Sequence, residues 1–188
     1  MRKVRLYDES AAAYHRRYQQ IQQIKYRAIA NYLQAGPVVD VGIGTGIGLP
    51  ILIDFAPVIG IDGAIEMLRI AQAQAQNPSN RQEPIHLVCG SAETLPLRTS
   101  AFPIAVSITV LQNLANIDAG INELLRITQI NGLVAVTALA KVLSLRDLKT
   151  RFNSSVINLA ELESLSNEDV GLILRVIQKK NSSITHSL

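Results

Sequence analysis

The feature that most constrains the fold is a glycine-rich segment within residues 37–62. It opens with a short β-branched run, 38–41, which is typical of a buried parallel strand. Alternating glycines follow directly, at Gly42, Gly44 and Gly46. Glycines at this spacing let the main chain turn tightly and let a ligand lie against it. A second apolar run then ends at Asp62, where doubly wound folds place the acidic residue that holds a ribose.

The glycine spacing departs from the dinucleotide-binding fingerprint, which reads G-x-G-x-x-G. Counted from Gly42, the third glycine of that fingerprint falls on Ile47, and counted from Gly44 it falls on Leu49. The segment reads G-x-G-x-G instead, with Asp40 two positions before the first glycine. A nicotinamide-dependent dehydrogenase is therefore the least favoured of the functions considered.

The string V-D-V-G-x-G-T-G at 39–46 resembles the first motif of class I S-adenosylmethionine-dependent methyltransferases. The Gly-Ile-Asp at 60–62 resembles their second motif, and the run ELLRITQINGLVAV at 123–136 resembles a later one. This resemblance implies an α/β fold: a Rossmann-like, doubly wound, seven-stranded, mostly parallel sheet with an antiparallel last strand. It also implies helices on both faces and an N-terminal cap helix. One methyltransferase domain over 1–188 is expected, with a cap segment at 1–35, a core at 36–178 and a flexible tail at 179–188.

The resemblance further implies a binding site for S-adenosyl-L-methionine. It assigns cofactor contacts to Tyr14, Asp40, Gly42, Gly44, Thr45, Gly46, Asp62, Gly63, Met67, Ser91, Ala92, Glu93 and Thr109. Tyr14 and Met67 are also compatible with simple core packing. Ser91 stands where the family usually has an acidic residue, and Pro103 stands where it usually has an aspartate. A serine hydroxyl can accept the same hydrogen bond, but without the charge that strengthens it.

Hydrophobic periodicity and breaker residues place the remaining elements. Helices are expected at 8–35, 47–55, 64–75, 118–129 and 143–152, and strands at 38–41, 58–61, 85–89, 133–137, 156–159 and 170–177. The range 102–111 is expected to contain the fourth strand and the loop after it. In the first helix an apolar stripe at helical spacing is expected to face the core: Tyr14, Tyr18, Ile21, Ile24, Ala28 and Tyr32. Cys89 is expected to be a buried thiol within its strand.

Charge is concentrated near the N-terminus. Residues 1–27 carry seven basic and two acidic side chains, a net +5, whereas the whole chain carries +3. Such a basic face is compatible with a nucleic-acid partner or with a solvated helix surface, and the solvated surface is the simpler interpretation. No apolar run reaches the roughly 18 residues that a membrane span needs, and no signal-peptide core follows the first residues. A cytoplasmic protein is expected.

The sequence indicates no metal site and no catalytic triad. A methyl sulfonium is already electrophilic, so a methyltransferase mainly has to align the reacting atoms and exclude water. The catalytic residues are unknown, and Tyr14, Tyr18, His15 and Gln112 are candidate bases by position only. Two hypotheses follow. One is a methyltransferase that acts on an unidentified small-molecule or macromolecular acceptor. The alternative is a non-catalytic S-adenosylmethionine-binding regulatory or scaffold subunit.

Overall fold

The computed structural model describes residues 2–77, 84–152, 155–165 and 168–178 of the 188-residue chain. In this part a seven-stranded sheet runs in the order β3-β2-β1-β4-β5-β7-β6. The strands are β1 Val38–Val41, β2 Val58–Asp62, β3 Ile85–Cys89, β4 Phe102–Ile108, β5 Thr128–Leu139, β6 Val156–Leu165 and β7 Asp169–Val176. β7 is antiparallel to both of its neighbours, and the remaining pairs are parallel. The predicted sheet is confirmed, while the predicted tail at 179–188 lies outside the described residues.

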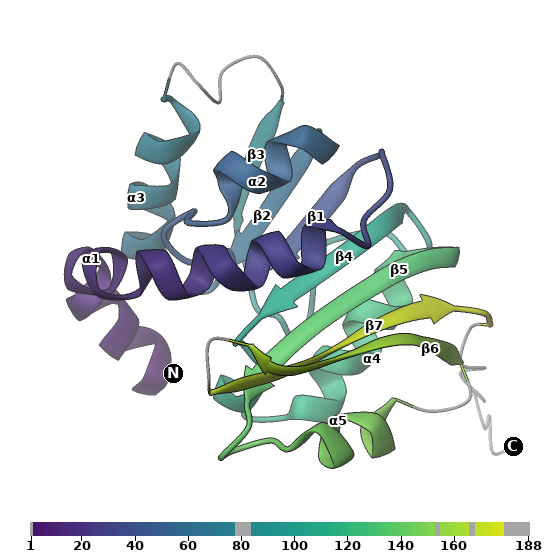
Figure 1. Ribbon diagram of the computed structural model, residues 1–188. Helices are drawn as coiled ribbons and strands as arrows, with labels where there is room; N and C mark the ends of the chain where they lie inside the picture. Colours follow the sequence, from purple (N-terminus) through teal and green to yellow (C-terminus); the bar gives the residue numbers. More distant parts are fainter. Residues whose placement is uncertain (1, 78–83, 153–154, 166–167, 179–188) are drawn as a thin grey trace, which may run out of the picture.

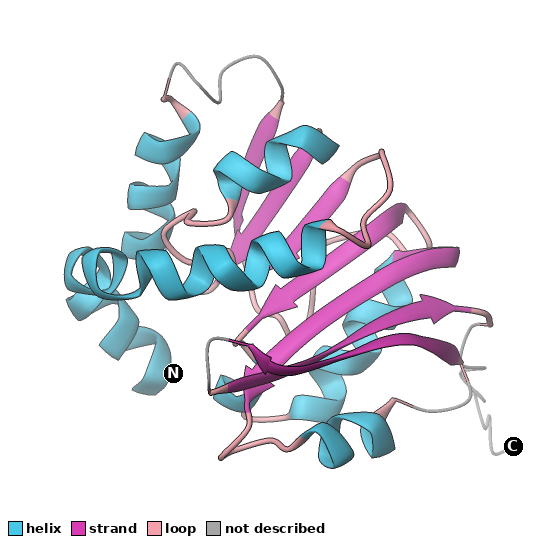
Figure 2. Ribbon diagram, in the orientation of Figure 1, coloured by secondary structure: helices cyan, strands magenta, loops and turns pink. Residues whose placement is uncertain are grey.

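Helices cover both faces of the sheet (Figures 1 and 2). One face carries α1 Arg2–Ala30, α2 Leu49–Leu52 with the 3-10 turn η1 Ile53–Phe55, and α3 Ile65–Ala75. The other face carries α4 Ile117–Ile127 and α5 Leu145–Arg151, and the 3-10 turn η3 Leu111–Asn113 follows β4. Local chemistry explains where these helices begin. Asn116 accepts from the Ala119 N–H to cap α4, and Ser144 and Asp147 form a capping box at α5.

Alternate residues of the central strands supply two hydrophobic cores, one on each face. Val39 and Val41 of β1 pack on the side of α4 and α5, together with Leu124. Val38 packs on the opposite side with Ile29 of α1. All four residues of β1 are buried, as expected for a parallel strand covered on both faces. These buried strands form a rigid base, and their carboxyl ends set the positions of the functional loops.

The connection from β3 to β4 has no helix in its described residues 90–101, and α4 holds it in place. Arg126 donates to the carbonyl oxygens of Leu95 at 3.0 Å and Leu97 at 2.8 Å. Glu123 accepts from the Leu95 N–H at 2.6 Å and is ion-paired with Arg126 at 2.6 Å. The hydrogen bond from Arg126 holds the pKa of Glu123 below its usual value. This pair anchors the loop that carries Ser91.

The cap helix α1 presents a different face to the sheet from the one predicted. Ile21 and Ile24 are 40% and 50% exposed, and Tyr32 beyond the helix is 41% exposed. The prediction that they face the core was therefore wrong. The helix instead buries a mixed polar and apolar set: Ala11, Gln22, Lys25, Tyr26 and Ile29. The helical period was right, but polar partners on the sheet decide which face is buried, because buried polar groups need hydrogen bonds.

Two positions at strand ends and edges also qualify the predictions. Cys89 is exposed, because β3 is an edge strand, so the predicted burial of its thiol was wrong. Pro103 lies in β4 where the register with β5 shifts between Phe102 and Ile104. A proline is tolerated at such an irregularity because its missing N–H removes no regular ladder bond. No helix in the described part of the chain is long and apolar enough to cross a membrane.

Candidate functional site

The sheet reverses its strand order between β1 and β4. From β1 the chain builds outward through β2 to β3, and then returns to the other side of β1 with β4. In open α/β sheets, ligands bind at such a switch point, beyond the carboxyl ends of the strands. The loops that follow β1, β2 and β4 are therefore the segments from which a site can be built.

The loop after β1 offers bare main chain at one residue. Gly44 has a φ of +56°, and a Cβ placed on it would meet no atom within 4 Å. Gly42, with φ +85°, lies against Val110, whereas Gly46 lies against Leu49 and Ala71. Gly42 and Gly46 are thus required for close packing. Gly44 faces open space, which leaves room for a ligand beside the backbone.

Asp62, at the end of β2, lies directly beside this glycine. Its Oδ2 accepts from the Gly44 N–H at 2.9 Å, and its Oδ1 accepts from the Ala64 N–H at 2.8 Å. These two main-chain donors belong to different loops and fix the orientation of the carboxylate. Asp62 therefore joins the glycine loop to the start of α3 and presents an oriented acceptor at the switch point.

Helix α1 crosses over these loops and is bonded to them. His15 Nδ1 lies 2.9 Å from Thr45 Oγ1, and Tyr26 donates its hydroxyl to Asp40 Oδ2 at 2.8 Å. Burial raises the pKa of Asp40 to about 7; its bond from Tyr26 opposes that shift and the charge of Asp62 adds to it. Tyr14 packs against a small cluster that contains Met67 of α3. The cap helix is thus bonded to the glycine loop at Thr45 and to the end of β1 at Asp40.

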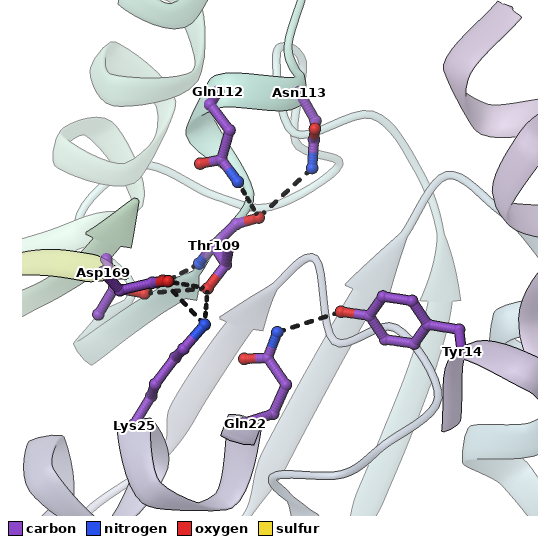
Figure 3. Close-up of polar contacts among 8 residues, drawn as sticks. Tyr14, Gln22, Lys25, Thr109, Gln112, Asn113 and Asp169 are labelled. Carbon is purple, nitrogen blue, oxygen red and sulfur yellow. Dashed lines mark hydrogen bonds and ion pairs between the residues drawn. The ribbon is translucent and has the colours of Figure 1, made fainter. Parts of the chain in front are cut away.

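Thr109, directly after β4, is the most heavily bonded residue of the site (Figure 3). Its backbone is left-handed, with φ +62°, a region that threonine rarely adopts. Its N–H donates to the carbonyl oxygen and hydroxyl of Thr137, both at 3.0 Å. Its carbonyl oxygen accepts from Gln112 at 2.7 Å and Asn113 at 3.4 Å. Its hydroxyl donates to Asp169 at 2.7 Å.

The family model that matches this chain is the methyltransferase domain, over residues 39–136. That segment contains the glycine loop, Asp62 and Thr109. The chain belongs to the methyltransferase domain family. This confirms the resemblance to class I S-adenosylmethionine-dependent methyltransferases that the glycine spacing indicated.

Solved structures with the same fold include other methyltransferases. One is an S-adenosylmethionine-dependent methyltransferase from Aquifex aeolicus, with a TM-score of 0.72 and 15% identity, covering 86% of this chain and 93% of that one. Another is magnesium protoporphyrin IX methyltransferase from Synechocystis PCC 6803 with bound S-adenosylmethionine, with a TM-score of 0.71 and 16% identity, covering 84% and 80%. A third is a chain of a complex that contains the Haloferax volcanii Trm112 methyltransferase activator, with a TM-score of 0.77 and 14% identity, covering 92% and 98%.

A similar protein is the uncharacterised MJ1252 of Methanocaldococcus jannaschii, 28% identical over 134 residues. The alignment covers 70% of this chain and 49% of that protein. This chain therefore spans about half the length of that relative.

The methyltransferase domain has residues that fit S-adenosylmethionine. Open space at Gly44 and the oriented Asp62 carboxylate suit a cofactor that presents hydroxyl groups to a glycine loop. Gly63 is exposed beside Asp62, and Met67 is buried at 2% exposure next to Tyr14. The structure thus brings together the predicted residues from α1, the glycine loop and α3. Their contact with the cofactor stays a prediction.

The predicted residues after β3 make other bonds in this structure. The hydroxyl of Ser91 accepts from the Glu93 N–H at 3.1 Å, closing a local turn. The carboxylate of Glu93 accepts from the N–H groups of Ala115 at 2.7 Å and Asn116 at 3.2 Å, ahead of α4. Asp40, another predicted contact, lies in β1 and not after β3; it is fully buried and accepts a hydrogen bond from Tyr26. These side chains support the loops around the cofactor site, and direct contacts from Ser91, Ala92 and Glu93 remain untested predictions.

The candidate bases have defined positions but no clear chemical activation. Tyr14 and Tyr18 lie with their ring centroids 4.7 Å apart, and Gln22 donates to the Tyr14 hydroxyl at 3.1 Å. Burial lowers the pKa of His15, which favours its neutral form. Among the described residues, no group of three or more histidine, cysteine or carboxylate side chains could hold a metal ion.

Sequence reasoning missed four polar residues of the site: Gln22, Lys25, Tyr26 and Asp169. The first three share the buried face of α1, at the spacing of one helix surface. The signal was present as a polar stripe between residues 22 and 26, but a polar stripe normally faces water. Asp169 lies in an acidic, serine-rich stretch and has no local signal at all. Only the return of β7 beside β5 brings it to Thr109.

Proposed function

We propose that this chain is an S-adenosylmethionine-dependent methyltransferase that acts in the cytoplasm on an acceptor still to be identified. The observation that carries the proposal is the pairing of open space at Gly44 with the Asp62 carboxylate, within a matched methyltransferase domain. When bound, S-adenosylmethionine supplies an electrophilic methyl group. Gly44, Asp62, Met67 and Tyr14 would hold this cofactor.

The residues of the chain contribute by orientation and by exclusion of water. Asp62 is held by two main-chain N–H groups, and α1 lies over the glycine loop through His15 and Tyr26. Alignment of two reacting groups can lower a barrier by roughly 7–11 kcal/mol without acid–base chemistry. In such a reaction the acceptor itself is the nucleophile that attacks the methyl group. The protein therefore needs no nucleophilic side chain of its own.

The test begins with calorimetric titration of the purified protein with S-adenosylmethionine, S-adenosylhomocysteine and NAD in parallel. We expect the first two to bind and NAD to give no heat. Asp62→Ala should weaken binding of S-adenosylmethionine at least tenfold, because the ribose hydroxyls lose their acceptor. The proposal would be rejected if the wild-type protein bound neither S-adenosylmethionine nor S-adenosylhomocysteine in this titration.

The alternative is a non-catalytic S-adenosylmethionine-binding subunit. It is supported by Ser91 and Pro103, which stand where the family usually has an acidic residue and an aspartate. Consumption of methyl-labelled cofactor separates the two hypotheses. The labelled assay should include RNA, because Arg16, Arg17 and Arg27 are exposed on α1. It should also be run with a Trm112-type activator, because a chain of similar fold was solved in a complex with one. Turnover on any acceptor favours the enzyme.

A further inference from the structure

Lys25 is an unusual residue to find on the buried face of a helix. It is 2% exposed, whereas Ile24 beside it is 50% exposed. A buried ammonium group is costly unless a charged partner compensates it. Its partner is Asp169 at the start of β7, with Nζ and Oδ2 separated by 2.8 Å. The pair thus joins the cap helix to a strand 144 residues further along the chain.

The hydroxyl of Thr109 contacts both charged groups, so Lys25, Asp169 and Thr109 form a closed triangle of polar contacts. This hydroxyl has one proton, which it donates to Asp169 Oδ2 at 2.7 Å, so it accepts from Lys25 Nζ at 2.9 Å. The hydroxyl of Thr137 approaches it at 3.3 Å. Figure 3 shows the lysine from α1 and the aspartate from β7 converging on this threonine.

The left-handed backbone of Thr109 needs such support. A non-glycine residue in this region costs about 1–2 kcal/mol and persists where its surroundings hold it. The turn matters because it directs the next residue, Val110, against Gly42 of the glycine loop. It also places the carbonyl oxygen of Thr109 where Gln112 and Asn113 can donate to it. The conformation of segment 109–113 therefore affects the packing of Val110 on the glycine loop.

We propose that Lys25 and Asp169 are positioning residues that hold Thr109 in its left-handed conformation, and thereby hold segment 109–113 against the glycine loop. They act through Thr109 and contact neither the cofactor nor the acceptor. The inference rests on the proposed function, since segment 109–113 follows β4 at the switch point, beside the proposed cofactor loop. It gives the buried polar face of α1 a role: the cap helix also shapes the side of the site opposite Asp62.

Hydrogen exchange of the purified protein tests this with three variants. Lys25→Met leaves Asp169 as an uncompensated buried charge. Lys25→Met/Asp169→Leu replaces both charges with apolar groups, a change that often preserves or raises stability. Lys149→Met removes the surface pair between Lys149 and Glu161, whose side chains are 49% and 35% exposed, and serves as the control.

We expect the amides of 109–113 to exchange at least tenfold faster in both Lys25 variants and at the wild-type rate in Lys149→Met. Amides of the core strand 38–41 should stay protected in the apolar double variant, which shows that the loss is local. Wild-type exchange at 109–113 in a stably folded double variant would overturn the proposal, because the pair would then be a replaceable packing contact. If Lys25→Met fails to fold, the double variant alone decides.

Two further measurements keep this inference separate from the proposed function. Calorimetry with S-adenosylmethionine should show binding at least threefold weaker in the double variant than in the wild type, because segment 109–113 packs on Gly42 of the glycine loop through Val110. With an acceptor in hand, kcat should also fall at least tenfold. An unchanged kcat would count against the positioning role. Absence of cofactor binding in the wild type would reject the proposed function, while the exchange result would still decide the role of the pair.

Discussion

At the residue scale, the candidate site depends on one glycine that faces open space and one carboxylate held by main-chain donors. Gly44 leaves room for a ligand, and Asp62 is aimed by the N–H groups of Gly44 and Ala64. Both residues were predicted from the sequence, because the alternating glycines after the first strand and the acidic residue at the end of the second are visible as a local pattern. Tyr26, which supports the neighbouring Asp40, was not predicted.

Replacing Gly44 with asparagine tests whether the cofactor needs the open space beside this residue, without imposing a large backbone strain that would unfold the protein. Asparagine tolerates a left-handed backbone better than other side chains, so Gly44→Asn should cost no more than about 1 kcal/mol of stability. The new side chain projects into the space expected for the cofactor, and affinity for S-adenosylmethionine should fall at least tenfold by calorimetry. Wild-type affinity in the folded variant would show that the cofactor lies elsewhere.

The raised pKa of Asp40 makes a prediction about stability and pH. Its pKa is about 7 in the folded protein against an ordinary 3.8, so the folded state keeps a proton that the unfolded chain releases between these values. The free energy of unfolding should therefore fall as pH rises from about 4 to about 7, with a slope of up to about 1.4 kcal/mol per pH unit. Denaturant unfolding of wild type and Asp40→Asn across this range measures it. Parallel pH profiles of the two proteins would contradict the assignment.

At the element scale, helices α1 and α4 each organise loops by polar contacts. In α4, Glu123 and Arg126 hold the β3–β4 connection at Leu95 and Leu97. In α1, the buried polar face bonds the ends of β1, β4 and β7. Hydrophobic periodicity located both helices, but it could not identify the buried face of α1, because buried lysine and glutamine break the rule on which that inference depends.

The contacts of Arg126 with the β3–β4 connection and with Glu123, here called the Arg126 clamp, should stabilise the fold more than an exposed ion pair does. Arg126→Met removes bonds to two carbonyl oxygens and to Glu123, so we expect a loss of about 1–3 kcal/mol in denaturant unfolding. Arg151→Met, which breaks the pair between Arg151 and Asp118 with side chains 34% and 64% exposed, should cost no more than about 1 kcal/mol. Equal losses in the two variants would mean that the loop does not depend on the clamp.

The orientation of α1 can be tested by two matched truncations. Ile29 is fully buried and Ile24 is half exposed. Ile29→Ala should destabilise the protein by about 2–4 kcal/mol, whereas Ile24→Ala should cost less than about 1 kcal/mol. The midpoints of denaturant unfolding give the comparison. The reverse order would restore the orientation that the apolar stripe first indicated.

At the scale of the whole molecule, the site exists because strand order brings distant segments to one edge. The switch point between β1 and β4 places the glycine loop, Asp62 and Thr109 together. The return of β7 between β5 and β6 adds Asp169 to the same place. The domain limits at 35 and 178 remain predictions, and the residues after 178 lie outside the described part of the chain.

The sequence by itself determined the fold class, the order of the strands and helices, and the glycine loop with Asp62. These follow from local spacing, because a strand, a glycine turn and the acidic residue after the next strand are each recognised from residues close together in the sequence. The sequence did not determine the bounds of every element: the first helix, predicted at 8–35, spans Arg2–Ala30, and β6, predicted at 156–159, continues to Leu165. Tertiary structure alone decided which face of α1 is buried, the pairing of Lys25 with Asp169, and the left-handed turn at Thr109. These depend on contacts between residues far apart in the chain, whose free energy is set by burial and by partners that no local pattern records.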